Sequence, residues 1–268
     1  RMVTKDKVVA IIGVWESLVA VPVAEASKEY PCLQFYFYSW ADEITANHYK
    51  YVFRIGVFNS LFAMQSMEFL KWADWKNVAV MVEESSYGFG QRDAMKKVNE
   101  EKYNGWFNLT FIPAAMGKSD YSAELTKVKA ISPKPDVLII HLNVPHAFII
   151  ARQAAELGLR DMGIKIMFGN DCPTWSPKSF WEAVGDAGVG TYFPTYYSPH
   201  MKLTKTGEEF WSLYKQKFGK EPFFAMGWEW DCLRILAKAI EDTKSVDPDV
   251  LAKYIENIDI EGTTGRIT

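Results

Sequence analysis

Histidine, cysteine and net charge are all scarce in this chain of 268 residues. It contains four His and three Cys, and its formal net charge is −3 at pH 7. So small an acidic balance argues against a nucleic-acid surface, which needs a basic face. No apolar run reaches the roughly 18 residues of a membrane span, and the opening RMVTKDK carries no signal-peptide pattern. The low charge therefore predicts no nucleic-acid partner and the short apolar runs predict no membrane span, whereas the missing signal-peptide pattern carries no conclusion.

The motifs of common catalytic and metal sites are also missing. His141 and His146 lie five residues apart, so a helix would not place them on one face. The segment 87–90, YGFG, lacks the third glycine of a dinucleotide fingerprint, and no Gly-x-Ser-x-Gly elbow occurs. We therefore predict no enzyme activity, no metal and no cofactor. The cysteines have no metal-like spacing, and their odd number leaves at least one free thiol: Cys32, Cys172 and Cys232.

What the chain does contain is an alternation of apolar strands and helices, organised around residues 7–17. The apolar run 8–12 stops at Gly13, and Ser17 opens a helical pattern. A short continuous apolar run is typical of a parallel strand buried between helices. The helix that follows it offers unpaired N–H groups and a hydroxyl at the carboxyl edge of the sheet, where anions and other ligands bind.

The same strand–helix alternation continues along the chain and predicts an α/β fold with two Rossmann-like lobes. Six further strands are expected at 32–37, 51–54, 77–82, 106–112, 136–141 and 164–168. We expect lobe 1 to comprise residues 1–75 and 199–261, and lobe 2 to comprise 76–198. Residues 262–268 would start a further crossing between the lobes. Both ends are interpreted as cuts through a longer chain.

Polar and aromatic residues follow the carboxyl ends of several predicted strands. Each also has a plainer interpretation: Ser17 as a helix cap, Trp15 and Trp40 as core, Tyr87 as a wedge, and Asp171 as a cap of the turn before a proline. Their convergence on one interlobe cleft is the stronger argument for a binding site. The candidate ligand-binding residues are Trp15, Glu16, Ser17, Ser39, Trp40, Tyr87, Asn143 and Asp171, with Ser86 beside them.

Landmarks along nearly the whole chain resemble the branched-chain amino-acid-type (leucine/isoleucine/valine-binding-like) solute-binding proteins of ABC transporters. They include DKVVAIIG, WADEIT, YVFRIG, NVAVMVEESSYGFG, PDVLIIHLNVPHAFIIARQAAELGL, FGND and EGTTGRIT. The resemblance implies the hinged, two-lobed type I periplasmic-binding-protein fold. The family's first strand, first helix and second strand are not represented here, and neither are its closing hinge strands.

The resemblance also implies roles for individual residues. Ser17 matches the serine that receives the ligand's α-carboxylate, Tyr87 the tyrosine that closes over the ligand, and Asp171 the acid that pairs with the α-ammonium. Two positions depart from the family. Trp40 stands at a threonine position, with Ser39 as the nearest hydroxyl, and Asn143 replaces an aromatic residue. These departures leave open a different amino acid, or a small or aromatic carboxylic acid.

We therefore expect an extracytoplasmic, non-catalytic solute-binding protein of an ABC importer. Its partners would be a small-molecule ligand and the membrane permease, and its location periplasmic or extracellular. A ligand-sensing domain of a receptor or regulator on the same fold is the first alternative. A Rossmann-like enzyme is the second, and it would require a cofactor fingerprint that the sequence lacks.

Overall fold

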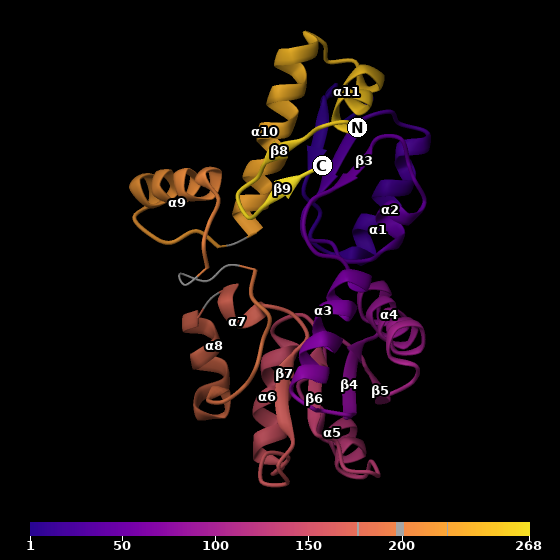
Figure 1. Ribbon diagram of the computed structural model, residues 1–268, viewed down its shortest axis with the longest axis vertical. Coiled ribbons are helices and arrows are strands. Elements are labelled where there is room, and N and C mark those ends of the chain that lie inside the picture. Colours follow the sequence, from indigo (N-terminus) through magenta and orange to yellow (C-terminus); the bar gives the residue numbers. More distant parts are fainter. Residues whose placement is uncertain (176, 197–200, 224) are drawn as a thin grey trace. The chain divides into compact units, whose positions relative to one another are not determined.

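The computed structural model describes residues 1–175, 177–196, 201–223 and 225–268 (Figure 1). Its contacts divide the chain into two compact units. Unit 1 comprises Arg1–Phe58 and Tyr196–Thr268, and unit 2 comprises Asn59–Thr195. Both units are built on parallel sheets flanked by helices, as the alternation of strands and helices predicts.

Unit 1 is built on a three-stranded parallel sheet in the order β1-β2-β3. Each strand is short because a polar or glycine-containing turn follows the apolar run. Phe35 faces a core that contains Cys232 and Leu251, whereas Tyr36 faces the opposite core beside Ala20. This alternation along one strand is what allows helices to cover both faces. The strands are β1 (Ala10–Ile12), β2 (Leu33–Tyr36) and β3 (Val52–Arg54).

Helices of unit 1 come from both ends of the chain. One face of the sheet carries α1 (Ser17–Glu25) and α2 (Glu43–Ala46), with the 3₁₀ turn η1 (Ala26–Lys28) after α1. The other face carries α10 (Ala225–Thr243) and α11 (Pro248–Ile255) (Figure 1). Unit 1 also contains α9 (Lys205–Phe218) and the antiparallel pair β8 (Ile260–Glu261) and β9 (Arg266–Ile267).

Unit 2 has a four-stranded parallel sheet in the order β5-β4-β6-β7. Side chains of β4 alternate between two cores, with Val80 in one and Met81 in the other. The strands are β4 (Asn77–Glu83), β5 (Asn108–Ala114), β6 (Val137–His141) and β7 (Lys165–Phe168).

Two groups of helices cover the faces of this sheet. The Val80 side is covered by α3 (Asn59–Trp72) and α4 (Ser86–Tyr103). The Met81 side is covered by α5 (Ser122–Lys129), α6 (His146–Glu156) and α8 (Pro177–Val184). The short α7 (Cys172–Trp175) and the 3₁₀ turn η2 (Gly185–Gly188) complete the unit.

The unit boundaries differ from the predicted lobes at three places, namely α3, Tyr196, which belongs to unit 1, and residues 262–268. Helix α3 belongs to unit 2, although the sequence analysis assigns it to lobe 1. The reason is packing, because Met67 and Leu70 of α3 share a core with Val78 and Val80 of β4. Residues 262–268 belong to unit 1, where they supply the loop and the second strand of the β8–β9 hairpin.

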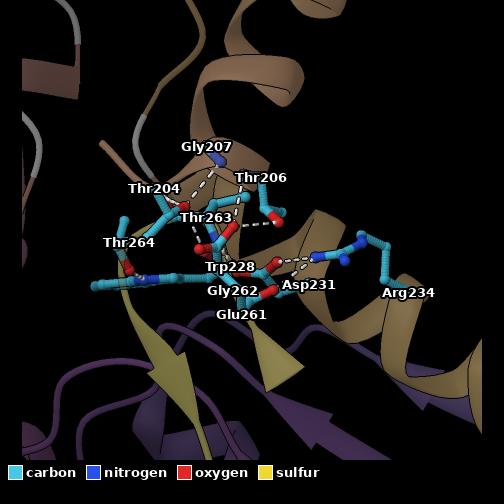
Figure 2. A network of polar contacts seen from close by, with 10 residues as sticks. All are labelled: Thr204, Thr206, Gly207, Trp228, Asp231, Arg234, Glu261, Gly262, Thr263 and Thr264. Atoms are coloured by element: carbon cyan, nitrogen blue, oxygen red, sulfur yellow. Dashed lines mark hydrogen bonds and ion pairs between the residues drawn. The ribbon is translucent and has the colours of Figure 1, made fainter. Parts of the chain in front are cut away.

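A buried carboxylate fixes the C-terminal hairpin to α10 (Figure 2). Asp231 Oδ2 accepts hydrogen bonds from the backbone N–H of Thr263 at 2.7 Å and from its hydroxyl at 2.8 Å. Its other oxygen lies 3.3 Å from Nη1 of Arg234. Trp228 donates its indole N–H to the hydroxyl of Thr264 at 2.9 Å. Two successive residues of the hairpin loop are therefore held by one helix.

The same loop is held from the start of α9. The Thr204 hydroxyl donates to the carbonyl of Gly262 at 2.6 Å and accepts from the N–H of Gly207 at 2.9 Å, which makes Thr204 both the helix cap and a tie to the loop. Glu261 accepts from the N–H of Thr206 at 3.0 Å. These bonds explain why the loop packs within unit 1.

All three cysteines are buried and free. Burial raises the pKa of each thiol, so each stays protonated and weakly nucleophilic at neutral pH. Within the described ranges, no helix combines the length and the apolar character needed to cross a bilayer.

We predict that Asp231→Ala lowers the free energy of unfolding by about 1–3 kcal/mol, because it leaves the buried N–H and hydroxyl donors of Thr263 without their acceptor. Urea denaturation measures the change. Asp242→Ala on the same helix is the control, since its pair with Lys238 is exposed and contributes little. Equal losses in the two variants would contradict the account of the hairpin.

Candidate functional site

Ser17 lies at the carboxyl edge of the unit 1 sheet, where the turn after β1 enters α1. It is buried, and its Oγ accepts hydrogen bonds from the backbone N–H groups of Trp40 and Ala41, each at 3.1 Å. Glu16, not Ser17, is the N-cap residue of α1. The Ser17 oxygen thus binds a turn more than twenty residues away, and the helix-cap interpretation is wrong.

The Ser17 hydroxyl still has its proton available for donation. A hydroxyl has one proton and two lone pairs, and two N–H groups occupy the oxygen. No acceptor for that proton is found in the part of the chain that the structure describes. Two donors polarise the hydroxyl, so its remaining proton is suited to an anionic acceptor.

Ser39 holds the turn after β1 in place. Val14 in this turn has φ of 60°, a conformation that is an outlier for a β-branched residue and therefore strained. The Ser39 hydroxyl lies within hydrogen-bonding distance of the carbonyl oxygens of Val14 and, at 3.1 Å, of Trp15. Its proton is thus used inside the protein, and Ser39 acts on the site by fixing the turn that leads into Ser17.

Aromatic rings of unit 1 gather beside this turn. Trp15 is 36% exposed, and its ring centroid lies 3.9 Å from that of Tyr38. Trp40 is buried, with its ring 5.9 Å from Tyr38 and 6.2 Å from Tyr196. Two further rings from the C-terminal part of the unit contact them: Phe223 packs against Trp15, and Trp228 against Tyr196. We call the whole set the aromatic row: Trp15, Tyr38, Trp40, Tyr196, Phe223 and Trp228.

Sequence reasoning finds only two members of the aromatic row. Tyr38 directly follows β2 and could have been included by the same rule that selects Trp40. Phe223 and Trp228 follow no predicted strand, and only the tertiary fold brings them into contact with Trp15 and Tyr196, respectively. Glu16 is exposed and precedes α1.

In unit 2, Tyr87 sits at the start of α4, directly after β4. Its side chain is buried, its ring stacks on His141 with centroids 4.1 Å apart, and its hydroxyl accepts from Nδ2 of Asn170 at 3.1 Å. Gly88 next to it makes this position possible, because a Cβ there would lie 2.0 Å from the carbonyl oxygen of Glu83. The stacked ring of His141 and the amide of Asn170 therefore fix the position of the Tyr87 side chain.

Asn170 joins the ends of two neighbouring strands. Nδ2 also donates to the carbonyl of Leu142 at 3.1 Å, and Oδ1 accepts from the N–H of Cys172 at 3.0 Å. The next residue, Asp171, is fully buried, and its carbonyl accepts from the N–H and the hydroxyl of Thr174, each at 2.8 Å. Asp171 thus begins the turn into α7, as its plainer interpretation proposes, and its carboxylate is held at the carboxyl end of β7.

Asn143 follows β6 and is tied to β4 through its backbone. Its N–H donates to Oε2 of Glu83 at 3.1 Å, and Oε1 of the same buried carboxylate accepts from the Ser85 hydroxyl at 2.7 Å. Ser86 begins α4, and its Oγ is buried with no hydrogen-bond partner among the described residues. Glu83, His141 and Asn170 are the residues of this edge that the sequence analysis misses.

His141 is held neutral at the centre of this cluster. It is completely buried, and Nδ1 lies 2.8 Å from the carbonyl oxygen of Gly169, which assigns the proton to Nδ1. Burial lowers the pKa of His141 to about 3, and the hydrogen bond to Gly169 offsets only part of that shift. A Cβ on Gly169 would approach the His141 ring within 2.5 Å, so the glycine leaves room for the ring.

No group of three or more His, Cys, Asp or Glu side chains in the described ranges is arranged to hold a metal ion. The polar groups at the carboxyl edge of each sheet are hydrogen-bond donors and acceptors, as Ser17 in unit 1 and Asn170 in unit 2 show.

Comparison with known proteins gives the family. The sequence pattern of the family described as periplasmic binding protein matches residues 1–268. This chain belongs to that family. Its members are solute-binding proteins, which are not enzymes and act outside the cytoplasm.

Solved structures of solute-binding proteins share the fold across the whole chain. The leucine-binding protein LivK of Thermotoga maritima matches with a TM-score of 0.87 and 27% identity, covering 100% of this chain and 74% of that one. LivJ of Streptococcus pneumoniae, in complex with isoleucine, gives 0.80 and 18%, covering 100% and 73%. A solute-binding protein of Rhodopseudomonas palustris, in complex with 4-hydroxybenzoate, gives 0.84 and 18%, covering 99% and 71%. The type I periplasmic-binding-protein fold is thus confirmed.

We predict that His141 makes the stability of this periplasmic binding protein fall in mild acid. The unfolded His titrates near pH 6.5 and the folded one near 3, so between these values only the unfolded state takes up the proton. The free energy of unfolding should therefore drop by up to about 1.4 kcal/mol per pH unit on this account. Denaturant unfolding between pH 7 and pH 4 measures the slope.

His141→Asn should flatten that slope, because Asn keeps an N–H donor for Gly169 and does not titrate. His48→Asn, at an exposed position, is the control and should retain the slope of the unmodified protein. Parallel slopes for His141→Asn and the unmodified protein would show that another group controls the acid response.

Proposed function

We propose that this chain is the substrate-binding component of an ABC importer and that it binds a small organic carboxylate, either an amino acid or an aromatic acid. The observation that carries the proposal is Ser17, whose oxygen is occupied by two N–H donors while its proton has no acceptor in the described ranges. The structurally similar proteins in complex with isoleucine and with 4-hydroxybenzoate support this ligand class. The partner of the loaded protein would be a membrane permease.

The carboxylate would be received at the carboxyl edge of the unit 1 sheet. Ser17 donates its hydroxyl proton to one carboxylate oxygen, and the start of α1 adds a positive partial charge. Ser39 contributes by holding the strained turn before α1. A charge-assisted hydrogen bond of this kind contributes about 1.5–3 kcal/mol.

The rest of the ligand would meet aromatic and acidic groups. Trp15 of the aromatic row is partly exposed and would contact an apolar or aromatic ligand body, with the buried rings of Tyr38 and Trp40 packed next to it. Asp171 of unit 2 would accept an ammonium group when the ligand is an amino acid. Tyr87 and Asn143 are proposed as contacts with the ligand body, and Glu16 as a residue at the edge of the site.

A thermal-shift screen tests the ligand class directly. We expect an L-amino acid or an aromatic carboxylate to raise the melting temperature, since a ligand at 100 times its Kd stabilises a protein by about 2.7 kcal/mol. The screen would contain branched-chain and aromatic amino acids, benzoate and 4-hydroxybenzoate. Failure of every carboxylate at millimolar concentration would contradict the proposed function.

Ser17→Ala should weaken the best ligand of that screen by about 1.5–3 kcal/mol in calorimetry, the contribution of a hydrogen bond to a charged group. Ser27→Ala is the matched control, because Ser27 is equally buried but lies in η1, after the end of α1. An unchanged Kd in the folded Ser17 variant would remove Ser17 from the site.

Asp171→Asn should weaken an amino acid by about 2–5 kcal/mol, the effect of removing one partner of a buried charge pair, and leave an aromatic acid without an amine nearly unchanged. The control is Asp136→Asn, because Asp136 accepts from the N–H of Asn77 at the opposite edge of the same sheet. Loss of both ligand types in the Asp171 variant would assign Asp171 to the fold instead of to an ammonium group.

A further inference from the structure

Arg54 is a partly buried cation at the carboxyl edge of the unit 1 sheet. It is the last residue of β3 and pairs in register with Tyr36, the last residue of β2. Its Nη2 donates to the carbonyl of Ala41, and its guanidinium carbon lies 5.3 Å from the centre of the Phe58 ring. Nε and Nη1 are both buried and have no hydrogen-bond partner in the part of the chain that the structure describes.

A guanidinium in this state favours a nearby anion. Burial lowers the pKa of Arg54 to about 10, although the charge of Asp42 acts in the opposite direction. Even at that pKa the side chain is fully charged at neutral pH. A charge whose Nε and Nη1 are buried without acceptors is costly unless negative charge lies nearby. Asp42 supplies part of that negative charge, and an anionic ligand bound at this edge would add to it.

Arg54 is connected to Ser17 through one residue. Ala41 accepts from Arg54 through its carbonyl oxygen and donates to Ser17 Oγ through its N–H. Arg54 and Ser17 therefore hold Ala41 from two sides, and the N–H groups that polarise the Ser17 hydroxyl belong to a turn that Arg54 anchors. The position of the turn and the potential around it both depend on the same side chain.

We infer that Arg54 is the positioning residue that makes this edge select a carboxylate over its neutral isostere, acting through Ala41 and through its own charge. The inference rests on the proposed function, and it identifies Arg54 as the source of the site's selectivity for an anion. It assigns no direct contact between Arg54 and the ligand. Nothing in the composition or in the strand pattern points to this role, because Arg54 lies inside a predicted strand rather than after it.

Two substitutions separate the charge from the hydrogen bond. Arg54→Gln keeps an N–H donor for the Ala41 carbonyl and removes the charge, whereas Arg54→Lys keeps both. Calorimetry would compare benzoate with benzamide, and L-leucine with L-leucinamide, using whichever pair the unmodified protein binds. We expect Arg54→Gln to weaken the carboxylate about tenfold or more and the amide by less than about twofold. Arg54→Lys should restore most of the preference.

The outcomes of this experiment distinguish failure of the inference from failure of the proposed function. If the unmodified protein binds no carboxylate of the pairs or of the screen, the proposed function fails and the inference fails with it. If the carboxylate binds but Arg54→Gln weakens carboxylate and amide equally, the inference is overturned and the function stands. Should neither variant fold, the unmodified protein still decides, because an amide that binds as tightly as its carboxylate overturns the inference.

Discussion

The two hydrogen bonds from the backbone of Trp40 and Ala41 to the Ser17 hydroxyl are the interaction on which the unit 1 site depends. They join the turn after β2 to the start of α1 at the carboxyl edge of the sheet. They also use the oxygen as an acceptor and so leave its proton for another molecule. Ser39 and Arg54 support this contact from either side, one through the turn after β1 and the other through Ala41.

In unit 2, buried polar side chains hold the carboxyl edge of the sheet together. Tyr87, His141 and Asn170 come from a helix start, a strand end and a loop, and they hold one another by ring stacking and hydrogen bonds. The stacked rings and the hydrogen bonds of Asn170 and of His141 Nδ1 restrict these side chains to one arrangement. Asp171 directly follows Asn170, so the hydrogen bonds of Asn170 also fix the backbone from which the Asp171 carboxylate extends.

Much of the fold could be predicted from local pattern because each strand is a short apolar run followed by a polar turn. The strands at 8–12, 77–82 and 136–141 all appear near their predicted positions. The unit boundary could not be placed in this way. Helix α3 is amphipathic, and its sequence does not say which sheet its apolar face covers; the contacts of Met67 and Leu70 with β4 decide that.

The candidate site was partly predictable for a similar reason. The rule that ligand groups follow strand ends selects Ser17, Trp40, Tyr87 and Asp171. It misses Arg54 and His141, which are the last residues of β3 and β6 and so count as strand rather than loop. It also misses Phe223 and Trp228, because residues from the far end of the chain reach the aromatic row only through the tertiary fold.

The most direct test of the account is a crystal structure of the protein with the carboxylate that binds it most tightly. The account predicts a carboxylate oxygen within about 3 Å of Ser17 Oγ, at hydrogen-bonding distance, with the Trp40 and Ala41 N–H groups still bound to the same hydroxyl. A ligand whose carboxylate is bound elsewhere, with no acceptor for the Ser17 proton, would contradict it.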